Sequence, residues 1–194
     1  MADTKVSALT AATTVAEADL IYLVTAALAS RKMVLSDLFP GFCQVALGKR
    51  TAGNLSLNST TWINLDTGLD LVIPGTSYAG DIVEVGMSGV WGAEATQPYI
   101  DVVSLISGSP VNTWAQDGAE AAGATGVSSW VGTNSVSTEF GGSIMRAIVS
   151  GDLSAGVLTL RFRYRASAAT AKTLNAVANT PLHVWAKNHG QPKT

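Results

Sequence analysis

The sequence predicts an all-β domain, a sandwich or a barrel, that follows an N-terminal segment of different character. From Phe42 onward, short runs rich in β-branched and aromatic residues alternate with turn residues, and no helical period of useful length appears there. Before that point Ser, Thr and Ala dominate up to Asp19, and Pro40-Gly41 marks a break. We therefore divide the chain into an N-terminal arm, residues 1–39, and a β domain, residues 40–194.

Within the arm, the apolar run Leu20–Val24 predicts a short strand. Further along the arm, Ser36 or Asp37 is suited to cap a helical turn. The polar, small-residue composition of the earlier part indicates a segment that orders only against a partner.

The β domain is expected to contain eleven short strands that are separated by Gly, Pro, Asn and Asp residues. The expected strands are Phe42–Leu47, Trp62–Leu65, Leu69–Ile73, Ile82–Trp91, Tyr99–Ile106, Val111–Ala115, Ser129–Gly132, Ser143–Val149, Val157–Arg165, Thr173–Val177 and Leu182–Lys187. The expected turns are Pro74-Gly75, Gly80-Asp81, Ser107–Pro110, Gly141-Gly142, Gly151-Asp152 and Asn179–Pro181.

The clearest strand is Val157–Arg165, which alternates with a period of two. One face is expected to carry Leu158, Leu160, Phe162 and Tyr164, and the other Thr159, Arg161, Arg163 and Arg165. The strand Ile82–Trp91 is less regular, and its Gly86 and Gly89 suggest a bulge or the close approach of another backbone.

Composition excludes several classes of protein. A formal net charge of -2 gives no basic excess for binding nucleic acid. The single Cys43 rules out an intrachain disulfide framework, and no secretory signal or membrane-spanning stretch is present. These features favour assembly in a reducing cytoplasm. Only 13% of the residues are charged, about half the usual share, which indicates a surface partly covered by a partner.

No reactive groups converge, so the sequence indicates a protein that is not an enzyme and needs no cofactor or metal. His183 and His189 would share a strand face only if the last strand continued, and solvent or interface positions are favoured over a metal pair. Asp66, Asp70, Asp81 and Asp101 fall near expected strand ends. Turn and cap roles are favoured for them over glycosidase chemistry.

Two groups of side chains are candidates for a subunit interface. The Arg161, Arg163 and Arg165 row is either the solvated face of a strand or a stripe that pairs with carboxylates of a neighbouring subunit. Trp185 is the second candidate, because one or two of the five tryptophans are expected at an interface and the others in the core.

The segment Lys5–Leu38 resembles one found near the start of many tailed-bacteriophage fibre and appendage proteins. The shared features are a Lys-hydrophobic-Ser start, a run of Leu and small residues, an acidic residue before a Asp-Leu pair, a short apolar strand, and a basic step into a final turn. Here these features are Lys5-Val6-Ser7, Leu9–Thr14, Glu17 with Asp19-Leu20, Ile21–Val24, Arg31-Lys32 and Val34–Leu38. The β domain, with its ending Pro181–Gly190, resembles the jelly-roll modules of the tumour-necrosis-factor and C1q type.

The resemblance implies a homotrimeric jelly-roll β-sandwich on the virion surface, with the arm bound to the major capsid protein or another virion protein. The expected function is a head-decoration or short head-fibre protein, which the lack of a long repetitive shaft favours over a tail-fibre or baseplate component. A module that binds carbohydrate on host surfaces through exposed tryptophans such as Trp91 or Trp130 is the alternative, and a glycan hydrolase is the third. The arm residues expected to anchor the protein are Lys5, Leu9, Leu20, Ile21, Leu23, Leu35 and Leu38.

Overall fold

The computed structural model of the chain describes residues 20–24, 30–34, 44–114, 127, 130–132 and 137–191. The chain divides into two compact units whose boundary lies between Cys43 and Gln44, a few residues after the predicted boundary at Phe39. Each unit is described by itself below.

The described part of the N-terminal unit is one antiparallel hairpin. It consists of β1 (Leu20–Val24) and β2 (Ser30–Val34), with Leu20 opposite Val34 and Val24 opposite Ser30. The strand predicted at Leu20–Val24 is therefore confirmed, whereas its partner β2 was not predicted. Ser36 and Asp37, the candidate caps of a helical turn, lie outside the described residues.

One sheet of the β domain has six strands, and its longest member, β7, pairs on both sides. The strands are β3 (Val45–Arg50), β4 (Leu55–Leu57), β7 (Ile82–Trp91), β10 (Thr138–Ala147), β13 (Lys172–Asn175) and β14 (Leu182–Asn188). β10 pairs along the whole of β7, and β14 pairs along its other side with β3 beyond it. β13 continues the line of β14 beside the end of β7, and β4 pairs with β13. The order across the sheet is therefore β10–β7–β14–β3.

The second sheet is arranged around the long strand β12. Its strands are β5 (Ile63–Asn64), β6 (Leu71–Val72), β8 (Pro98–Ile106), β9 (Ser109–Thr113), β11 (Leu153–Ser154) and β12 (Val157–Ala166). β8 pairs with one side of β12 and β5 and β6 with the other, while β9 pairs with β8. Two single-turn 3-10 helices, η2 (Thr67–Leu69) and η4 (Ser150–Asp152), lead into β6 and β11.

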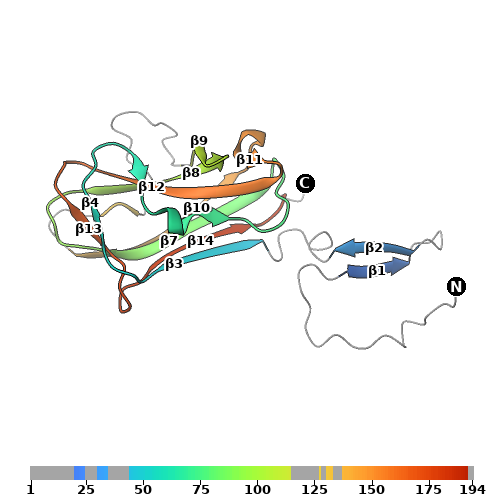
Figure 1. The fold of residues 1–194 in the computed structure, drawn as a ribbon, viewed down its shortest axis with the longest axis horizontal. Helices are drawn as coiled ribbons and strands as arrows, with labels where there is room; N and C mark the ends of the chain where they lie inside the picture. Colours follow the sequence, from blue (N-terminus) through green and yellow to red (C-terminus); the bar gives the residue numbers. More distant parts are fainter. Residues whose placement is uncertain are drawn as a thin grey trace. The chain divides into compact units, whose positions relative to one another are not determined.

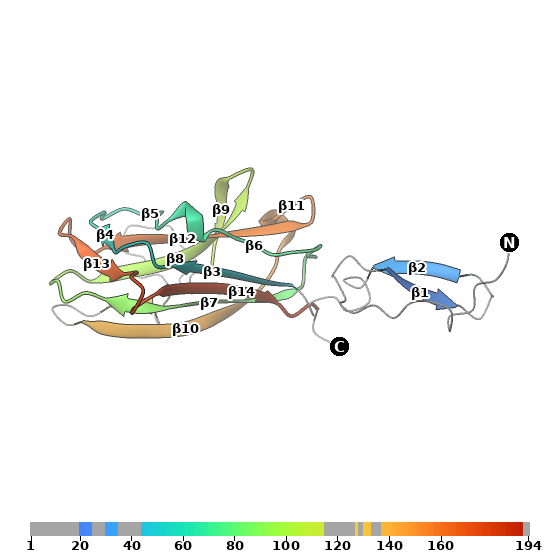
Figure 2. The same ribbon diagram turned by 60° about the horizontal axis from the view of Figure 1, so that its bottom comes forward.

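The connections make this two-layered β-sandwich a jelly roll. Successive strands cross from one sheet to the other between β4 and β5, β6 and β7, β7 and β8, β9 and β10, β10 and β11, and β12 and β13 (Figures 1 and 2). The first strand of the domain, β3, lies beside the last, β14, and all strand pairs are antiparallel. This is the pairing of a double-sheet jelly roll, as the sequence analysis predicted.

The hydrophobic core lies between the two sheets. Leu158, Leu160, Phe162 and Tyr164 are all buried in it, which confirms the predicted inner face of β12. Burial of each large apolar side chain contributes about 1.5–3 kcal/mol to stability. The sandwich therefore has a sufficient core without the N-terminal unit.

Tryptophans occupy the centre of this core. Trp91 and Trp130 are fully buried, and Trp91 Nε1 donates to the carbonyl of Trp130 over 3.2 Å. Trp130 Nε1 donates in turn to the carbonyl of Gly142 over 3.1 Å, so both polar ring atoms are satisfied. The expectation that most tryptophans fill the core is confirmed.

Several predicted boundaries are wrong. Gly141-Gly142, predicted as a turn, lies inside β10, where the two residues pair with Ser88 and Met87. The ladder along β7 supplies enough hydrogen bonds to hold glycines in a strand despite their low propensity. Trp130–Gly132, predicted as part of a strand, is not a strand in the structure, since the Trp130 amide donates to the carbonyl of Val127 three residues earlier, as in a turn.

Other strands are displaced along the chain by a few residues. Strand β3 begins at Val45 rather than Phe42, and β9 ends at Thr113 rather than Ala115. Strand β4 was not predicted, because its three residues are too short to show a period. Within the described ranges, no helix is long and apolar enough to cross a membrane.

Candidate assembly face

The outer surface of the β10–β7–β14–β3 sheet is the strongest candidate for a functional site. Residues directly opposite each other in an antiparallel ladder project to the same side, so the registers define this surface in three rows across the four strands. We call it the assembly face. Its residues are Lys49, His183, Ser88 and Gly141 in one row, Leu47, Trp185, Gly86 and Ser143 in the next, and Val45, Lys187, Glu84 and Met145 in the third.

Large apolar side chains stand exposed at both edges of the assembly face. Leu47 on β3 is 79% exposed and Met145 on β10 is 64% exposed, while Val45 is 40% exposed. A single exposed apolar residue needs no explanation, but several on one sheet face indicate a surface that a partner covers.

The part of the assembly face on β7 and β10 contains several small residues. Gly86, Ser88, Gly141 and Ser143 lie on the adjacent strands β7 and β10. Small side chains allow another chain to come close to the sheet. The face therefore combines exposed apolar residues at its edges with small residues on β7 and β10.

Trp185 lies directly over Gly86. A Cβ atom on Gly86 would stand 1.9 Å from Cε2 of the indole, so only glycine leaves room for this ring. The sequence analysis attributed Gly86 to a bulge or to a close backbone, and this interpretation is wrong. β7 pairs with β10 and β14 without a shift of register, and a side chain takes the space instead.

A groove of about 340 Å³ runs beside the Trp185 ring. It is lined by Leu47, Gly48, Lys49, His183, Val184 and Trp185, from the two strands β3 and β14. Its walls are mostly apolar, with Lys49 and His183 as the polar groups.

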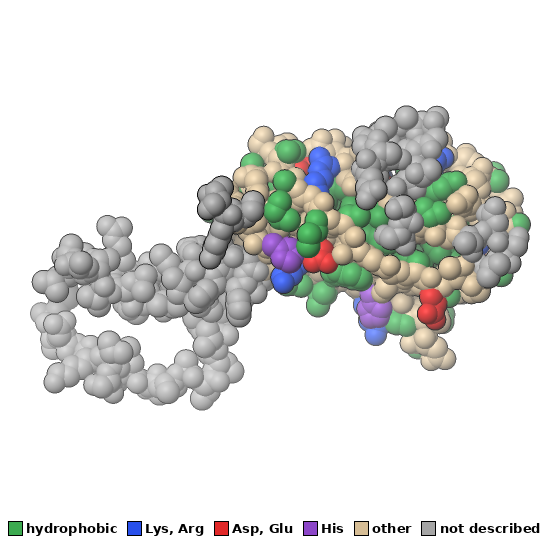
Figure 3. All heavy atoms as spheres, turned by 180° about the vertical axis from the view of Figure 1, so that it is seen from behind, with side chains coloured by type: hydrophobic (Ala, Val, Ile, Leu, Met, Phe, Trp, Pro, Cys, Tyr) green, Lys and Arg blue, Asp and Glu red, His purple; other side chains and the backbone are tan. Residues whose placement is uncertain are grey.

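Charges of both signs flank the apolar residues. Glu84 accepts hydrogen bonds from Ser143 Oγ over 2.7 Å and lies 3.1 Å from His189 Nε2. These bonds, that of Ser143 first, lower the pKa of Glu84 below its ordinary value, and the charge of Lys187 acts in the same direction. Figure 3 shows both His side chains in purple on the face it draws, each beside a Lys or Arg side chain and among hydrophobic ones.

The arginine row lies on the other sheet, away from Trp185. Arg161 binds Asp70 with two of its nitrogens, at 2.9 and 2.5 Å, and Arg163 binds Asp101 over 3.0 Å. Both arginines thus have a carboxylate of their own chain. The pairing of this row with a neighbouring subunit stays a prediction.

The third arginine is packed between aromatic rings. The Arg165 guanidinium lies 4.7 Å from the Tyr99 ring centre and 5.5 Å from that of Trp62. Such contacts are worth about 0.5–1 kcal/mol at exposed sites. The predicted solvated face of β12 is therefore largely occupied by contacts within the chain.

Of the predicted anchoring residues, Leu20, Ile21 and Leu23 belong to β1. Lys5, Leu9, Leu35 and Leu38 lie outside the described residues, as does Cys43. The anchoring role of all seven stays a prediction.

The scattered aspartates have structural roles. Asp66 caps η2 by accepting from the Gly68 amide, and Asp81 accepts from the Tyr78 amide and from Asn188 Nδ2. The predicted cap and turn roles are confirmed for these two, while Asp70 and Asp101 hold arginines instead. Over the described ranges, no group of three His, Cys, Asp or Glu side chains is arranged to hold a metal ion.

The tryptophans named for sugar stacking are not available for it. Trp91 and Trp130 are fully buried, so this part of the carbohydrate-binding hypothesis is wrong. The sequence pattern around the two tryptophans does not reveal which face is inner, since both expected strands have apolar residues on each side.

Sequence reasoning also missed most of the assembly face. Apolar and polar residues do not alternate regularly around Leu47 and Met145, so the sequence does not show whether their side chains point toward the core or toward solvent. Two signals were available: Trp185, a candidate on composition, and Gly86, a glycine inside a strand that indicated a close approach without identifying the neighbouring group.

Comparison with known proteins adds little to these observations. No family model and no curated protein matches the chain. Among solved structures, the chain is similar to Eiger TNF from S. frugiperda, with a TM-score of 0.40 and 6% sequence identity over 78% of this chain and 95% of that chain. The assignment to the jelly-roll class rests on the strand pairing itself.

Proposed function

We propose that the chain is a structural protein of a tailed-bacteriophage particle, and that it works as a homotrimer whose assembly face is buried between subunits. The observation that carries the oligomer is the set of exposed apolar side chains, Leu47, Met145 and Val45, on one sheet. Association that covers them removes apolar surface from water, which contributes roughly 25 cal/mol per Å² before the costs of association.

A second copy of the chain is the partner that best fits this face. Leu47 and Val45 at one edge of the face and Met145 at the other are all exposed, so that apolar side chains of one copy can pack against those of another. Lys187 and Glu84 supply both signs of charge, so two copies meet without a like-charge excess. When one part of this face on a subunit binds a different part of the face on the next subunit, the subunits form a closed ring if the rotation between neighbours allows it. Three subunits form such a ring.

The phage assignment rests on the arm. Its motifs resemble those of fibre and appendage proteins, and the structure divides the chain just after them, between Cys43 and Gln44. We propose that the arm holds the protein on the capsid and that the jelly roll projects from it, as in a head-decoration or short head-fibre protein. A tail-fibre or baseplate position is the alternative.

Particle assembly with a truncated protein tests this function. The full chain and a chain without residues 1–39 are produced with the other virion proteins, and labelled particles are imaged. The full chain is expected on the head, and the truncated one is expected to fold but to stay off the particles. Truncated protein that still joins particles normally would refute the anchoring role, and label on the tail would favour the alternative position.

A further inference from the structure

The outer surface of the second sheet contains an open cavity, lined by both polar and apolar groups, that the proposed assembly does not use. Its volume is about 410 Å³, and it is lined by Asp70, Leu105, Ser107, Gly108, Ser154, Val157, Thr159 and Arg161. Asp70 directly precedes β6, and the other residues belong to the β8–β9 and β11–β12 hairpins. Three separate segments of the chain therefore meet at one place.

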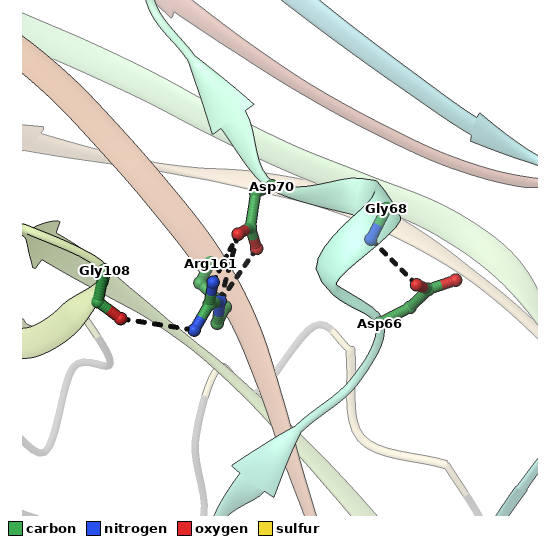
Figure 4. A network of polar contacts seen from close by, with 5 residues as sticks. All are labelled: Asp66, Gly68, Asp70, Gly108 and Arg161. Carbon is green, nitrogen blue, oxygen red and sulfur yellow. Dashed lines mark hydrogen bonds and ion pairs between the residues drawn. The ribbon is translucent and has the colours of Figure 1, made fainter.

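The floor of the cavity is an ion pair with fixed geometry. Arg161 Nε lies 2.9 Å from Asp70 Oδ1 and its Nη2 lies 2.5 Å from Oδ2, while Nη1 reaches the carbonyl of Gly108 over 3.4 Å (Figure 4). A guanidinium has five N–H groups, so these three contacts leave N–H groups on Nη1 and Nη2 for a further acceptor. Asp70 keeps lone pairs for a further donor.

The two charges cancel. The hydrogen bonds to Asp70 stabilise the charged guanidinium and raise the pKa of Arg161 above its ordinary value, and the opposite charges of the two groups leave the pair with no net charge. The site consequently offers donors and acceptors side by side without attracting an anion or a cation. A pair of neighbouring hydroxyls, each a donor and an acceptor, matches this arrangement.

Three hydroxyl groups surround the ion pair. Those of Ser107, Ser154 and Thr159 have no hydrogen-bond partner among the residues that the structure describes. Val157, which is 39% exposed, adds an apolar surface at the same cavity. The site thus combines unpartnered hydroxyls, a neutral ion pair and an aliphatic patch.

The turn that supplies Ser107 is a tight hairpin turn. Ser107 and Gly108 have φ angles of 51° and 80°, as a tight two-residue hairpin turn requires. The β11–β12 turn repeats this geometry at Ala155 and Gly156, with φ angles of 51° and 79°.

We propose that this cavity binds one neutral hexopyranose unit of a glycan. Adjacent sugar hydroxyls bind the Arg161–Asp70 pair and the hydroxyl of Thr159, and the C–H face of the sugar ring rests on Val157. The site lies on the sheet opposite the assembly face, so a trimer would leave it accessible.

Ligand-observed NMR tests this site in the full chain. The probes are the methyl glycosides of glucose, galactose, mannose and N-acetylglucosamine, with methyl glucuronide as the acidic probe, and short glucose oligomers distinguish a chain unit from a free sugar. We expect millimolar binding of at least one neutral glycoside. Thr159→Val should weaken it about threefold to tenfold, the effect of one lost hydrogen bond.

Two further variants test whether the loss of binding is specific to the cavity and whether the charge balance of the ion pair sets the preference for neutral sugars. Thr180→Val removes a hydroxyl outside the cavity and should leave binding unchanged. Asp70→Asn leaves Arg161 uncompensated and should shift the preference toward methyl glucuronide. The proposal is overturned if no neutral glycoside binds at tens of millimolar, if Thr159→Val binds as well as the unmodified chain, or if the unmodified chain prefers the acidic probe.

Discussion

The two sheets of the jelly roll present outer faces of opposite character. The second sheet is rich in charge, but Arg161 and Arg163 are matched by Asp70 and Asp101 of the same chain. The first sheet also has charged side chains on its outer face, Lys49, Glu84 and Lys187 among them, but it leaves the apolar Leu47 79% exposed. The comparison shows that a regular row of charged residues can stabilise the fold through ion pairs within the chain. The exposed apolar side chains lie instead on strands with a less regular sequence pattern.

The largest expected effect concerns the buried ion pair on the second sheet. Asp101 is 1% exposed and Arg163 6%, and removing one partner of such a pair leaves a charge without compensation. Asp101→Ala should lower the free energy of unfolding by about 3–5 kcal/mol, measured by urea denaturation. The double variant Asp101→Leu/Arg163→Met should recover most of this loss. A double variant as unstable as the single one would contradict the interpretation.

A smaller effect is expected from filling the space under Trp185. Gly86→Ala places a methyl group where the indole lies and should cost about 1–3 kcal/mol of stability, the usual cost of overpacking. It should also displace the ring, which changes tryptophan fluorescence and weakens self-association. Gly141→Ala is the matched control on the same face, because its Cβ would lie 3.5 Å from the nearest atom. Equal effects of the two substitutions would argue against a special role for Gly86.

A smaller loss of stability is expected from the Arg161–Asp70 ion pair of the second sheet, which is more exposed than the Arg163–Asp101 pair. The side chains of Arg161 and Asp70 are 14% and 19% exposed, more than those of Arg163 and Asp101. Asp70→Asn should therefore cost at most about 1 kcal/mol in the same denaturation experiment. A cost as large as that of Asp101→Ala would mean that burial does not set the difference between the two pairs.

The smallest effect is a pH dependence at the edge of the assembly face. Hydrogen bonds from Ser143 and His189 lower the pKa of Glu84 in the folded chain, so the folded state binds this proton less readily than the unfolded state. The resulting stabilisation is complete above the ordinary value of 4.5 and is lost as the pH falls below it. Glu84→Gln should flatten this part of the stability curve. An identical acid limb in both proteins would show that Glu84 contributes nothing there.

The sequence predicted the fold class and the inner face of β12, because a strict period of two fixes which residues point inward. Ile82–Trp91 was also predicted with its correct bounds. The partners of Arg161 and Arg163 could not be predicted, since Asp70 and Asp101 are brought to them only by the pairing of β6 and β8 with β12. The placement of Trp185 over Gly86 depends on the register of two strands about a hundred residues apart, which no local pattern encodes.

Most of the assembly face could not be predicted from the sequence either. Leu47 was predicted at the end of a strand, but nothing in its neighbourhood indicated that it points away from the core. Its exposure follows from the pairing of β3 with β14, which turns Ala46 inward and leaves Leu47 opposite Trp185. Trp185 itself was predicted for an interface on composition alone.

The molar mass of the protein in solution, measured by light scattering at micromolar concentration, tests the central claim most directly. The unmodified chain is expected to be a trimer, and Leu47→Glu a folded monomer, because a charge would replace an apolar side chain that association buries. Leu47 is exposed in the single chain, so the substitution should change its stability by no more than about 0.5 kcal/mol. A monomeric unmodified chain, or a trimer that survives Leu47→Glu unchanged, would contradict the account.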